Sequence, residues 1–486
     1  MMEYNLNNAS SANVFLVKRS NIEDRFDAAF YLPAYTSLLS KNKHWYKCKD
    51  ISYSIQHPPE YERIYSENGI QLIRSQNIRP LGLNLNESPV YFSEDFLQRK
   101  KVIYPSIGDV LIVRSGVNAG DVAVIEENTK KAIIGADNLL LKPDLTKIIP
   151  KFIQVYFFTN VGRTLLNRYL TGATNKHISP YYLARVDIPV IPINKQQTCV
   201  SIFEQNLSLK QQKESQAQEL LDSIDTYLLN ELGITLPIQD NSLKNRIFSS
   251  KISDLSGSRF DPKLYDNSTV ALRQSIDSTN FPIAKLKELI IQSVAGDWGM
   301  DENANVNEDF IKCLVIRATE FNNEANLTLD NSRVKYRMIH KNKLSKIDIQ
   351  ENDLLIEKSG GSIDQPVGRI AIITKEYIDE NQLCYSNFIH KIRVDSSKVN
   401  PEYLFCFLKT MHNVKHTEAM QSQTNGIRNL IMSSYFKQSI ILPKITKQTE
   451  IAENIKSILN DIKVLQTDAS NALESAKQEI EKMILG

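Results

Sequence analysis

The sequence predicts an α+β protein with two repeated mixed α/β domains, separated by two long α-helices that form an antiparallel coiled coil. The first observation is a collinear repeat: RFDAAFYLP from Arg25 is answered by SRFDPKLYD from Ser258, and GDVLIVRSG from Gly108 by NDLLIEKSG from Asn352. The second is a run of short strand-like segments, and the third is a long heptad pattern at the end of each copy. Two similar units in one chain can be related by a pseudo-twofold axis, and we expect one here.

The strand prediction depends on short β-branched runs bounded by Gly, Asn and Pro. In copy one these runs are GIQLIRSQNI, DVLIVRS, DVAVIEE and NLLLKPD, at 69–78, 109–115, 121–127 and 138–144. The stretch at 152–170 has helical spacing instead, so it is predicted to be one helix packed on the sheet. PKFIQVYFF from Pro150 is answered by PEYLFCFLK from Pro401 in copy two. Strands and helices are therefore mixed within each copy.

Each copy ends in a predicted long helix that follows a proline-containing segment, PINKQQ from Pro192 in copy one and PKITKQ from Pro443 in copy two. Apolar residues then recur with alternating steps of four and three, and Gly233 is the expected stop in copy one. Lys210 and Glu214 are polar members of this seam and weaken its middle. One such helix cannot bury its stripe alone, so we expect the two to pair, although each could lie on its own domain. The predicted coiled-coil contacts are Leu207, Leu221, Ile224, Leu228, Ile451, Ile455, Ile458, Ile462 and Leu465.

These patterns divide the chain into five parts. The first domain is predicted at 1–194, the first long helix at 195–233, and a linker at 234–250. The second domain follows at 251–444 and the second long helix at 445–486.

Composition indicates an ordinary soluble protein, with 42% hydrophobic and 23% charged residues. There is no stretch of 18 apolar residues and no signal-like N-terminus, so we expect no membrane span and a cytoplasmic location. The five cysteines are scattered without a C-x-x-C pair, which favours reduced thiols. A net charge of +2 neither requires nor excludes a nucleic acid partner, because binding needs only a local basic surface.

A search for catalytic motifs finds no convincing site. HPPEY at 57–61 lacks the first residue and the ring of an amino-methyltransferase loop, and neither G-x-G-x-x-G nor a P-loop is present. Asp353, Glu357 and Lys358 resemble a metal-nuclease cluster only superficially, and a strand flanking a loop is the preferred interpretation. His412 and His416 have ligand spacing but lack an acidic third ligand, so a solvated helix face is expected rather than a metal site. The chain is predicted to be non-catalytic by itself and to bind no metal.

Polar loops repeat at matching places in the two copies while their residues differ. They are rich in Arg, Lys, Asn and Gln, whose side chains match the edges of bases, and in Gly, which lets backbone approach phosphate. Any one of these residues could belong to an ordinary polar turn, but the repeated set favours contact with a ligand. The candidates for DNA binding are Arg74, Gln76, Asn77, Arg114, Ser115, Asn118, Asn175, Lys176, His177, Arg317, Thr319, Lys358, Ser359, Asn425 and Arg428.

With these motifs in order, the chain resembles a specificity subunit of a type I restriction–modification system over nearly its whole length. The resemblance is carried by the two RFD openings, the GDVLIVRSG and NDLLIEKSG strands, and the proline-containing starts of the long helices. The GDWG string at Gly296–Gly299 is also similar to such domains, and it adds Trp298 to the DNA-binding candidates.

The resemblance implies two target-recognition domains, each reading one half of an asymmetric split sequence in double-stranded DNA. It implies that the paired helices set the gap and dock two methyltransferase subunits, with restriction and translocase subunits joining them. S-adenosylmethionine, ATP and Mg would then be bound by those partners and none by this chain. Two other classes stay open: a non-catalytic scaffold that binds proteins through the same loops, and an enzyme with an unfamiliar site. A related methylation-based phage-defence system would use a similar subunit.

Overall fold

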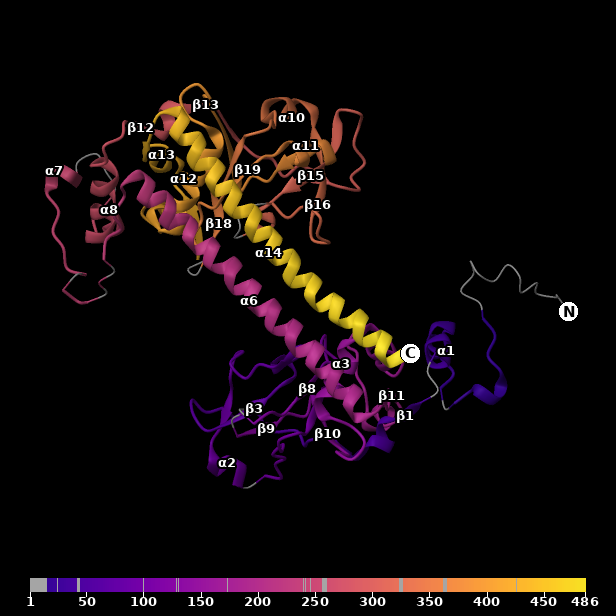
Figure 1. The fold of residues 1–486 in the computed structure, drawn as a ribbon. Coiled ribbons are helices and arrows are strands. Elements are labelled where there is room, and N and C mark those ends of the chain that lie inside the picture. Colours follow the sequence, from indigo (N-terminus) through magenta and orange to yellow (C-terminus); the bar gives the residue numbers. More distant parts are fainter. Residues whose placement is uncertain are drawn as a thin grey trace. The chain divides into compact units, whose positions relative to one another are not determined.

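The structure is a computed structural model that describes the chain except at 1–14, 24, 42–43, 99, 128, 130, 173, 239, 241, 245, 256–259, 323–326, 362–364 and 425. The chain forms two compact units, the first from 1–214 with 466–486 and the second from 215–465. Two long helices, α6 (Ile193–Leu232) and α14 (Ile445–Leu485), contribute one part to each unit (Figure 1). The predicted five-part division places its boundaries elsewhere and stays a prediction.

The first unit holds one strand-rich domain. Its strands are β1 (Trp45–Lys47), β2 (Ser52–Gln56), β3 (Ile70–Ile73), β4 (Ile78–Arg79), β5 (Gly82–Leu83), β6 (Tyr91–Phe92), β7 (Val110–Val113), β8 (Val122–Val124), β9 (Ala132–Ile134), β10 (Asn138–Pro143) and β11 (Asp187–Pro189). Its helices, apart from the long ones, are α1 (Pro33–Ser40), α2 (Glu94–Gln98), α3 (Pro150–Phe158), α4 (Asn160–Asn167) and α5 (Pro180–Leu183).

The second unit holds the other strand-rich domain. Its strands are β12 (Ile283–Lys285), β13 (Ile290–Ala295), β14 (Met300–Asp301), β15 (Phe310–Ile316), β16 (Lys335–His340), β17 (Leu354–Glu357), β18 (Ser359–Gly361), β19 (Ile370–Ile372), β20 (Leu383–Tyr385), β21 (Ile389–Val394), β22 (Gln421–Thr424), β23 (Ile427–Leu430) and β24 (Ser439–Ile441). Its shorter helices are α7 (Ile252–Leu255), α8 (Asn267–Asp277), α9 (Leu286–Leu289), α10 (Lys341–Ile347), α11 (Lys375–Glu380), α12 (Pro401–Asn413) and α13 (Met432–Tyr435).

The two domains share one topology. An antiparallel sheet of order β2-β10-β7-β8 in the first matches β13-β21-β17-β19 in the second. A parallel pair also recurs, β3 with β9 and β15 with β20, as does a short antiparallel pair, β1 with β11 and β12 with β24. The prediction of two repeated mixed α/β domains is therefore confirmed.

The predicted single helix at 152–170 is instead two helices, α3 and α4. Thr159 interrupts them with an extended backbone (φ −68°, ψ 157°), and its hydroxyl accepts a hydrogen bond of 3.1 Å from the Gly162 amide. Gly162 lies so close to the Tyr156 carbonyl that a Cβ would stand 2.1 Å from its oxygen. Helical spacing continues across this turn because both helices bury an apolar face, which is why the sequence did not reveal the break.

The long helices run antiparallel to each other within each unit. In the first unit the Lys213 ammonium lies 2.9 Å from the Asp468 carboxylate. In the second unit Asn454 donates to the Tyr227 hydroxyl, and the Lys447 ammonium lies 2.7 Å from a carboxylate oxygen of Glu231. Partners that come later in α6 come earlier in α14, as the predicted antiparallel pair requires.

The predicted seam is buried unevenly. Ile224, Leu228, Ile451, Ile455 and Ile462 are buried, whereas Leu207, Leu221, Ile458 and Leu465 are half-buried. Lys210 and Glu214, the polar members of the seam, form an ion pair with each other. Gly233 has a positive φ of 66° directly after α6, so the predicted C-terminal stop is confirmed.

The helices also enter the cores of the two domains. In the first unit Phe203 and Ile480 join the buried cluster that holds Ile112 and Phe152 of the domain. In the second unit Leu228 and Ile451 share a cluster with Leu354 and other domain residues. The two packing modes considered from the sequence are thus combined, because the helices pair and their ends also pack on the domains.

A buried glutamine ties the start of each long helix to its domain. Gln196 accepts a hydrogen bond from the Ile149 amide at 2.8 Å and donates to the carbonyls of Lys147 and Ile191. In copy two the corresponding residue, Gln448, accepts from the Asn400 amide at 2.8 Å and donates to the Pro443 carbonyl. The structure therefore aligns Gln196 with Gln448, whereas the sequence pairing of Pro192 with Pro443 is one residue out of register.

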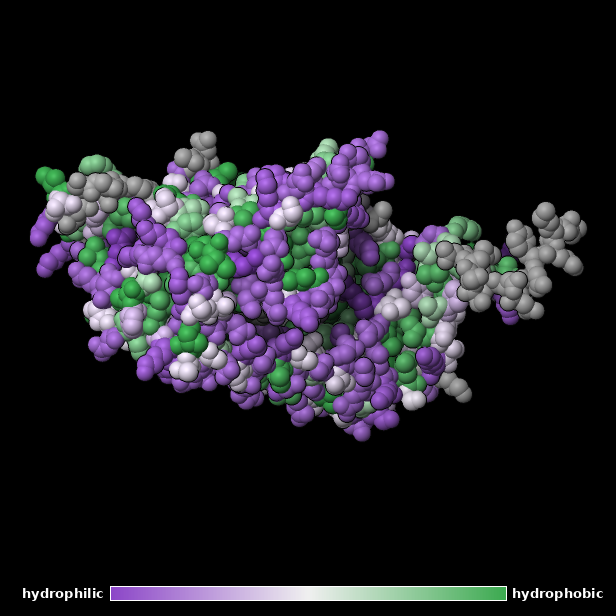
Figure 2. All heavy atoms as spheres, turned by 90° about the horizontal axis from the view of Figure 1, so that it is seen from above, coloured by the Kyte–Doolittle hydropathy of each residue, from purple (hydrophilic) through white to green (hydrophobic). Residues whose placement is uncertain are grey.

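Hydrophilic residues dominate the face of the molecule drawn in Figure 2, with apolar side chains scattered among them. Among the described residues, no helix combines the length and apolar character needed to cross a membrane.

We predict that Gln196→Leu destabilises the first unit by about 2–4 kcal/mol, because one buried amide and two carbonyls lose their partner. Chemical denaturation of the full chain would measure the loss. Gln197→Leu is the matched control, because this neighbouring side chain is exposed. Equal stability of the two variants would contradict the role of the buried glutamine.

Candidate nucleic-acid interface

Two of the predicted polar loops meet in the first unit at the end of β7. The Arg114 amide donates to the Asp137 carbonyl at 2.7 Å, and the Ile178 amide donates to the Arg114 carbonyl at 2.9 Å. The Gly116 amide donates to the Lys176 carbonyl at 3.1 Å. The loop that begins at Arg114 therefore lies between the turn after β9 and the loop before α5.

The second unit repeats this arrangement with other residues. The Lys358 amide donates to the Phe388 carbonyl at 2.9 Å, and the Leu430 amide donates to the Lys358 carbonyl at 2.7 Å. Here the two loops are regular enough to form strands, and β18 pairs with β23 so that Ser359 lies opposite Asn429.

The third predicted loop joins through the parallel strands. The Gly135 amide donates to the Ile73 carbonyl at 2.9 Å, directly before the loop that starts at Arg74. In the second unit the Ser386 amide donates to the Ile316 carbonyl at 2.8 Å, directly before Arg317. Carboxyl ends of parallel strands lie at one edge of a sheet, so the loops that follow them meet there.

We call each meeting point a loop junction. Loop junction one comprises the described residues of 74–77, 114–118, 135–138 and 171–178. Loop junction two comprises the described residues of 317–320, 358–361, 386–389 and 421–430.

Some predicted DNA contacts are held by the loops themselves. Asn77 is buried; its side chain accepts from the Arg74 amide and donates to the carbonyls of Asn84 and Glu87. In the second unit the Arg317 guanidinium donates to the Glu320 carboxylate at 2.6 Å and also to the Arg333 carbonyl. This geometry makes Asn77 and Arg317 positioning residues of their loops.

The remaining candidates differ in exposure. Asn175, Lys176, His177 and Thr319 are exposed, and Gln76, Arg114, Ser115, Asn118, Lys358, Ser359 and Arg428 are half-buried. Asn425 lies outside the described residues. The structure therefore brings most candidates together in two groups, one per unit, and their contact with DNA stays a prediction.

Trp298 belongs to the GDWG string, which contacts loop junction two through Gly296. The Arg337 guanidinium stands over its ring, 4.8 Å from the centroid, and the half-buried ring packs on the β15 core. Gly296 of the same motif presses against the turn after β20, where a Cβ would stand 2.2 Å from the Ser386 carbonyl oxygen. The GDWG string thus supports the turn that carries the loops.

Two junction residues were missed by the sequence analysis, Asp137 and Phe388. They occupy equivalent turns, and both are exposed, Phe388 at 51% of its surface. The sequence carried no signal for them, because only the parallel pairing of β9 with β3 and of β20 with β15 places these turns beside the loops.

The carboxylates that resembled a metal-nuclease cluster have cationic partners within the chain. Asp353 is buried against Lys391 at 2.9 Å and Arg393 at 2.7 Å, and Glu357 is buried against Arg369 at 2.8 Å. Asp353 precedes strand β17 and Glu357 is its last residue, directly before the loop, as the predicted strand beside a loop requires. Within the described part of the chain, His, Cys, Asp and Glu side chains form no group that could hold a metal ion.

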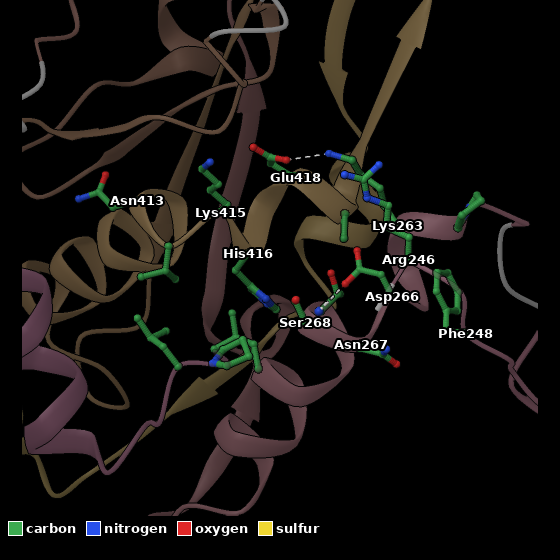
Figure 3. A pocket seen from close by; sticks show the side chains of 17 residues that line it. Arg246, Phe248, Lys263, Asp266, Asn267, Ser268, Asn413, Lys415, His416 and Glu418 are labelled. Carbon is green, nitrogen blue, oxygen red and sulfur yellow. Dashed lines mark hydrogen bonds and ion pairs between the residues drawn. The ribbon is translucent and has the colours of Figure 1, made fainter. Parts of the chain in front are cut away.

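The expectation that His412 and His416 lie on a solvated helix face is wrong. His416 is only 6% exposed and lines a pocket of about 690 Å³ that also includes Lys263, Asp266 and Glu418 (Figure 3). Burial, with the charge of Arg273 nearby, lowers the pKa of His416 to about 4, and burial also lowers the pKa of His412. His412 is half-buried on α12, whereas His416 begins the short helix after the turn and is buried, so the two do not share one solvated helix face.

Comparison with known proteins agrees with this architecture. A protein-family model described as "Type I restriction modification DNA specificity domain" matches residues 286–475. The type I restriction enzyme MjaVIII specificity subunit of Methanocaldococcus jannaschii is 21% identical over 390 residues, which is 79% of this chain and 80% of that protein.

One solved structure shares the fold, and two others are similar at lower TM-scores. One from a study of complex assembly and conformational transition of the type I R-M system has a TM-score of 0.52 at 11% identity, covering 91% of this chain and 97% of that one. The HsdS subunit of Thermoanaerobacter tengcongensis has a TM-score of 0.40 at 13% identity, and the S subunit of M. genitalium 0.41 at 12%. These two alignments cover 91% of this chain and 96% and 97% of those chains.

Residues 286–475, which match the model of a type I DNA specificity domain, cover most of the second strand-rich domain, and the first domain repeats its topology. Over most of its length the chain is similar to the specificity subunit of a type I restriction enzyme.

We predict that the second unit loses stability as pH falls. The pKa of folded His416 is about 4 against an ordinary 6.5, so the unfolded chain binds a proton more readily between these values. This difference in pKa is expected to lower the free energy of unfolding by about 2 kcal/mol between pH 8 and pH 5. Denaturation of the His416→Gln chain at both pH values should show a loss smaller by about this amount. The exposed His177→Gln change is the control, and equal losses in both variants would contradict the prediction.

Proposed function

We propose that this chain is the non-catalytic recognition subunit of a type I complex, and that each unit reads one half of an asymmetric bipartite DNA sequence. The observation that supports this is the pair of loop junctions, which share backbone hydrogen bonds but differ in side chains. A shared scaffold holds both sets of loops in one geometry. Different side chains on that scaffold select different bases, so the two half-sites should differ.

We further propose that the helix pair sets the gap between the half-sites. Half-sites read from one face of a duplex lie about 34 Å apart, and the 40 residues of α6 span about 60 Å. Ion pairs and buried apolar residues between α6 and α14 support the proposal that the two helices act together as a spacer.

The partners in this proposal are double-stranded DNA, two methyltransferase subunits docked on the helix pair, and restriction or translocase subunits. Catalysis, with S-adenosylmethionine, ATP and Mg, belongs to these partners, and the complex works in the cytoplasm. The curated relative from M. jannaschii is named as the specificity subunit of a type I restriction enzyme, which supports this assignment.

Deletion of the gene is expected to abolish methylation of one bipartite, non-palindromic motif in the host genome. Methylome sequencing with and without the gene measures this directly. Restoring the gene should return the same motif, and restoring it with loop junction one replaced by the residues of loop junction two should change one half-site only. A continuous or palindromic motif would contradict the proposal. A protein-binding scaffold would show neither methylation loss nor the steep salt dependence of DNA binding.

The spacer is tested by lengthening both helices together. Four residues inserted after Gln216 and four after Leu465 add about 6 Å to each helix at points that face one another in the antiparallel pair. We expect the preferred gap between the half-sites to increase while both half-site sequences stay unchanged. Insertion in α14 alone is the control, because it shifts the seam and should lower stability. An unchanged gap in the double insertion would show that the helices do not set it.

A further inference from the structure

The turn after the second parallel strand carries opposite chemistry in the two units at one equivalent position, Asp137 in the first and Phe388 in the second. We propose that this position determines specificity: Asp137 accepts a hydrogen bond from the N4 amino group of a cytosine, and Phe388 contacts the C5-methyl group of a thymine. This inference rests on the proposed function and names residues that read the two half-sites.

Backbone hydrogen bonds establish the equivalence. The Asp137 carbonyl accepts from the amides of Arg114 and Ser115, as the Phe388 carbonyl accepts from those of Lys358 and Ser359. One residue later, the Asn138 amide donates to the Gly135 carbonyl, as the Ile389 amide donates to the Ser386 carbonyl in the other unit. The two turns therefore hold their Cα atoms in one local geometry, so the difference between the units at this position lies in the side chain.

Both side chains lie in loops that are rich in residue types suited to DNA contact. Asp137 is exposed, and its carbonyl accepts from the amide of the half-buried Arg114. Ser115 donates to Oδ1 of Asp137 at 3.2 Å, which orients the carboxylate from within the junction. Phe388 is half exposed, and its ring lies next to Gly360, where a Cβ would stand 3.9 Å from Cδ2.

The chemistry of each residue indicates what it would read. A carboxylate among basic loops repels phosphate and lowers general DNA affinity. It contributes selectivity when it accepts a hydrogen bond, and the cytosine N4 amino group is the donor in the major groove that acidic side chains accept from. A phenyl ring on a polar loop has no such bond to make, but thymine presents an apolar methyl group in the same groove.

A purely local role is the competing explanation for Asp137, because its carboxylate also accepts from Ser115. Asp137→Asn keeps an acceptor oxygen and the size of the side chain, so it preserves most of that local contact. It also adds two donors, which reverse the preference for an amino group. Ser115→Ala removes the local bond while it leaves the carboxylate in place.

The experiment selects bound duplexes from a library with randomised half-sites, using the full chain assembled with its methyltransferase. Asp137→Asn should lower the preference for cytosine at one position of one half-site by about tenfold and leave the other half-site unchanged. It should also strengthen binding to unrelated DNA, since a negative charge is lost. Asp95→Asn, which removes an exposed carboxylate of α2, is the matched control and should leave the motif unchanged.

The Phe388 arm uses a change in the DNA. Replacing thymine by deoxyuridine removes only the C5-methyl group, so at one position of the second half-site it should weaken binding by the unmutated chain several-fold. The Phe388→Ala chain should bind both duplexes equally. Ile291→Ala, on an exposed apolar side chain of β13 outside both loop junctions, is the control and should keep the response to deoxyuridine.

The outcomes separate two failures. If the unmutated chain selects a bipartite motif that neither Asp137→Asn nor Phe388→Ala alters, the inference is wrong and the proposed function stands. An effect of Ser115→Ala equal to that of Asp137→Asn, or a uniform loss across both half-sites, would assign Asp137 a positioning role and also overturn the inference. If the unmutated chain selects no bipartite motif, the proposed function fails and the inference fails with it.

Discussion

The buried glutamine at the start of each long helix is the contact on which the architecture depends. Gln196 and Gln448 join the first turn of a helix to the backbone of a strand-rich domain, in a place closed to water. Apolar residues one and two turns further along the same helices then enter the domain core. A hydrogen-bonded amide gives direction where apolar burial alone gives only attraction, so each domain is fixed to its helix in one orientation.

Both units also anchor the same strand of the antiparallel sheet in the same way, although the loops that follow it differ. In both units a carboxylate precedes the central strand of the antiparallel sheet, Asp109 before β7 and Asp353 before β17. Each pairs with a cation on the neighbouring strand, Lys142 at 3.1 Å and Arg393 at 2.7 Å. The strand is therefore held at its start by a retained interaction, while the loop at its other end differs between the units.

Features set by local pattern or by repetition could be predicted from the sequence. Strands, long helices and their pairing follow from periodicity, and the order of motifs revealed the duplication. Non-local packing could not be predicted: the break at Thr159, the burial of His416 and the inward turn of Asn77 depend on partners far away in the sequence or on the backbone of a turn. Asp137 was missed for the same reason, because only the parallel pairing of β3 and β9 places its turn beside the reading loops.

The second unit has a stronger polar anchor than the first. Lys391 adds a fully buried ammonium to the pair formed by Asp353 and Arg393, whereas the corresponding place in the first unit is taken by the apolar Leu140. Removing one partner of such a buried cluster leaves an uncompensated charge and lowers stability by about 3–5 kcal/mol. The second unit therefore tolerates less change beneath its loops than the first. Side chains at exposed loop positions such as Phe388 lie outside this buried cluster and can change without disturbing it.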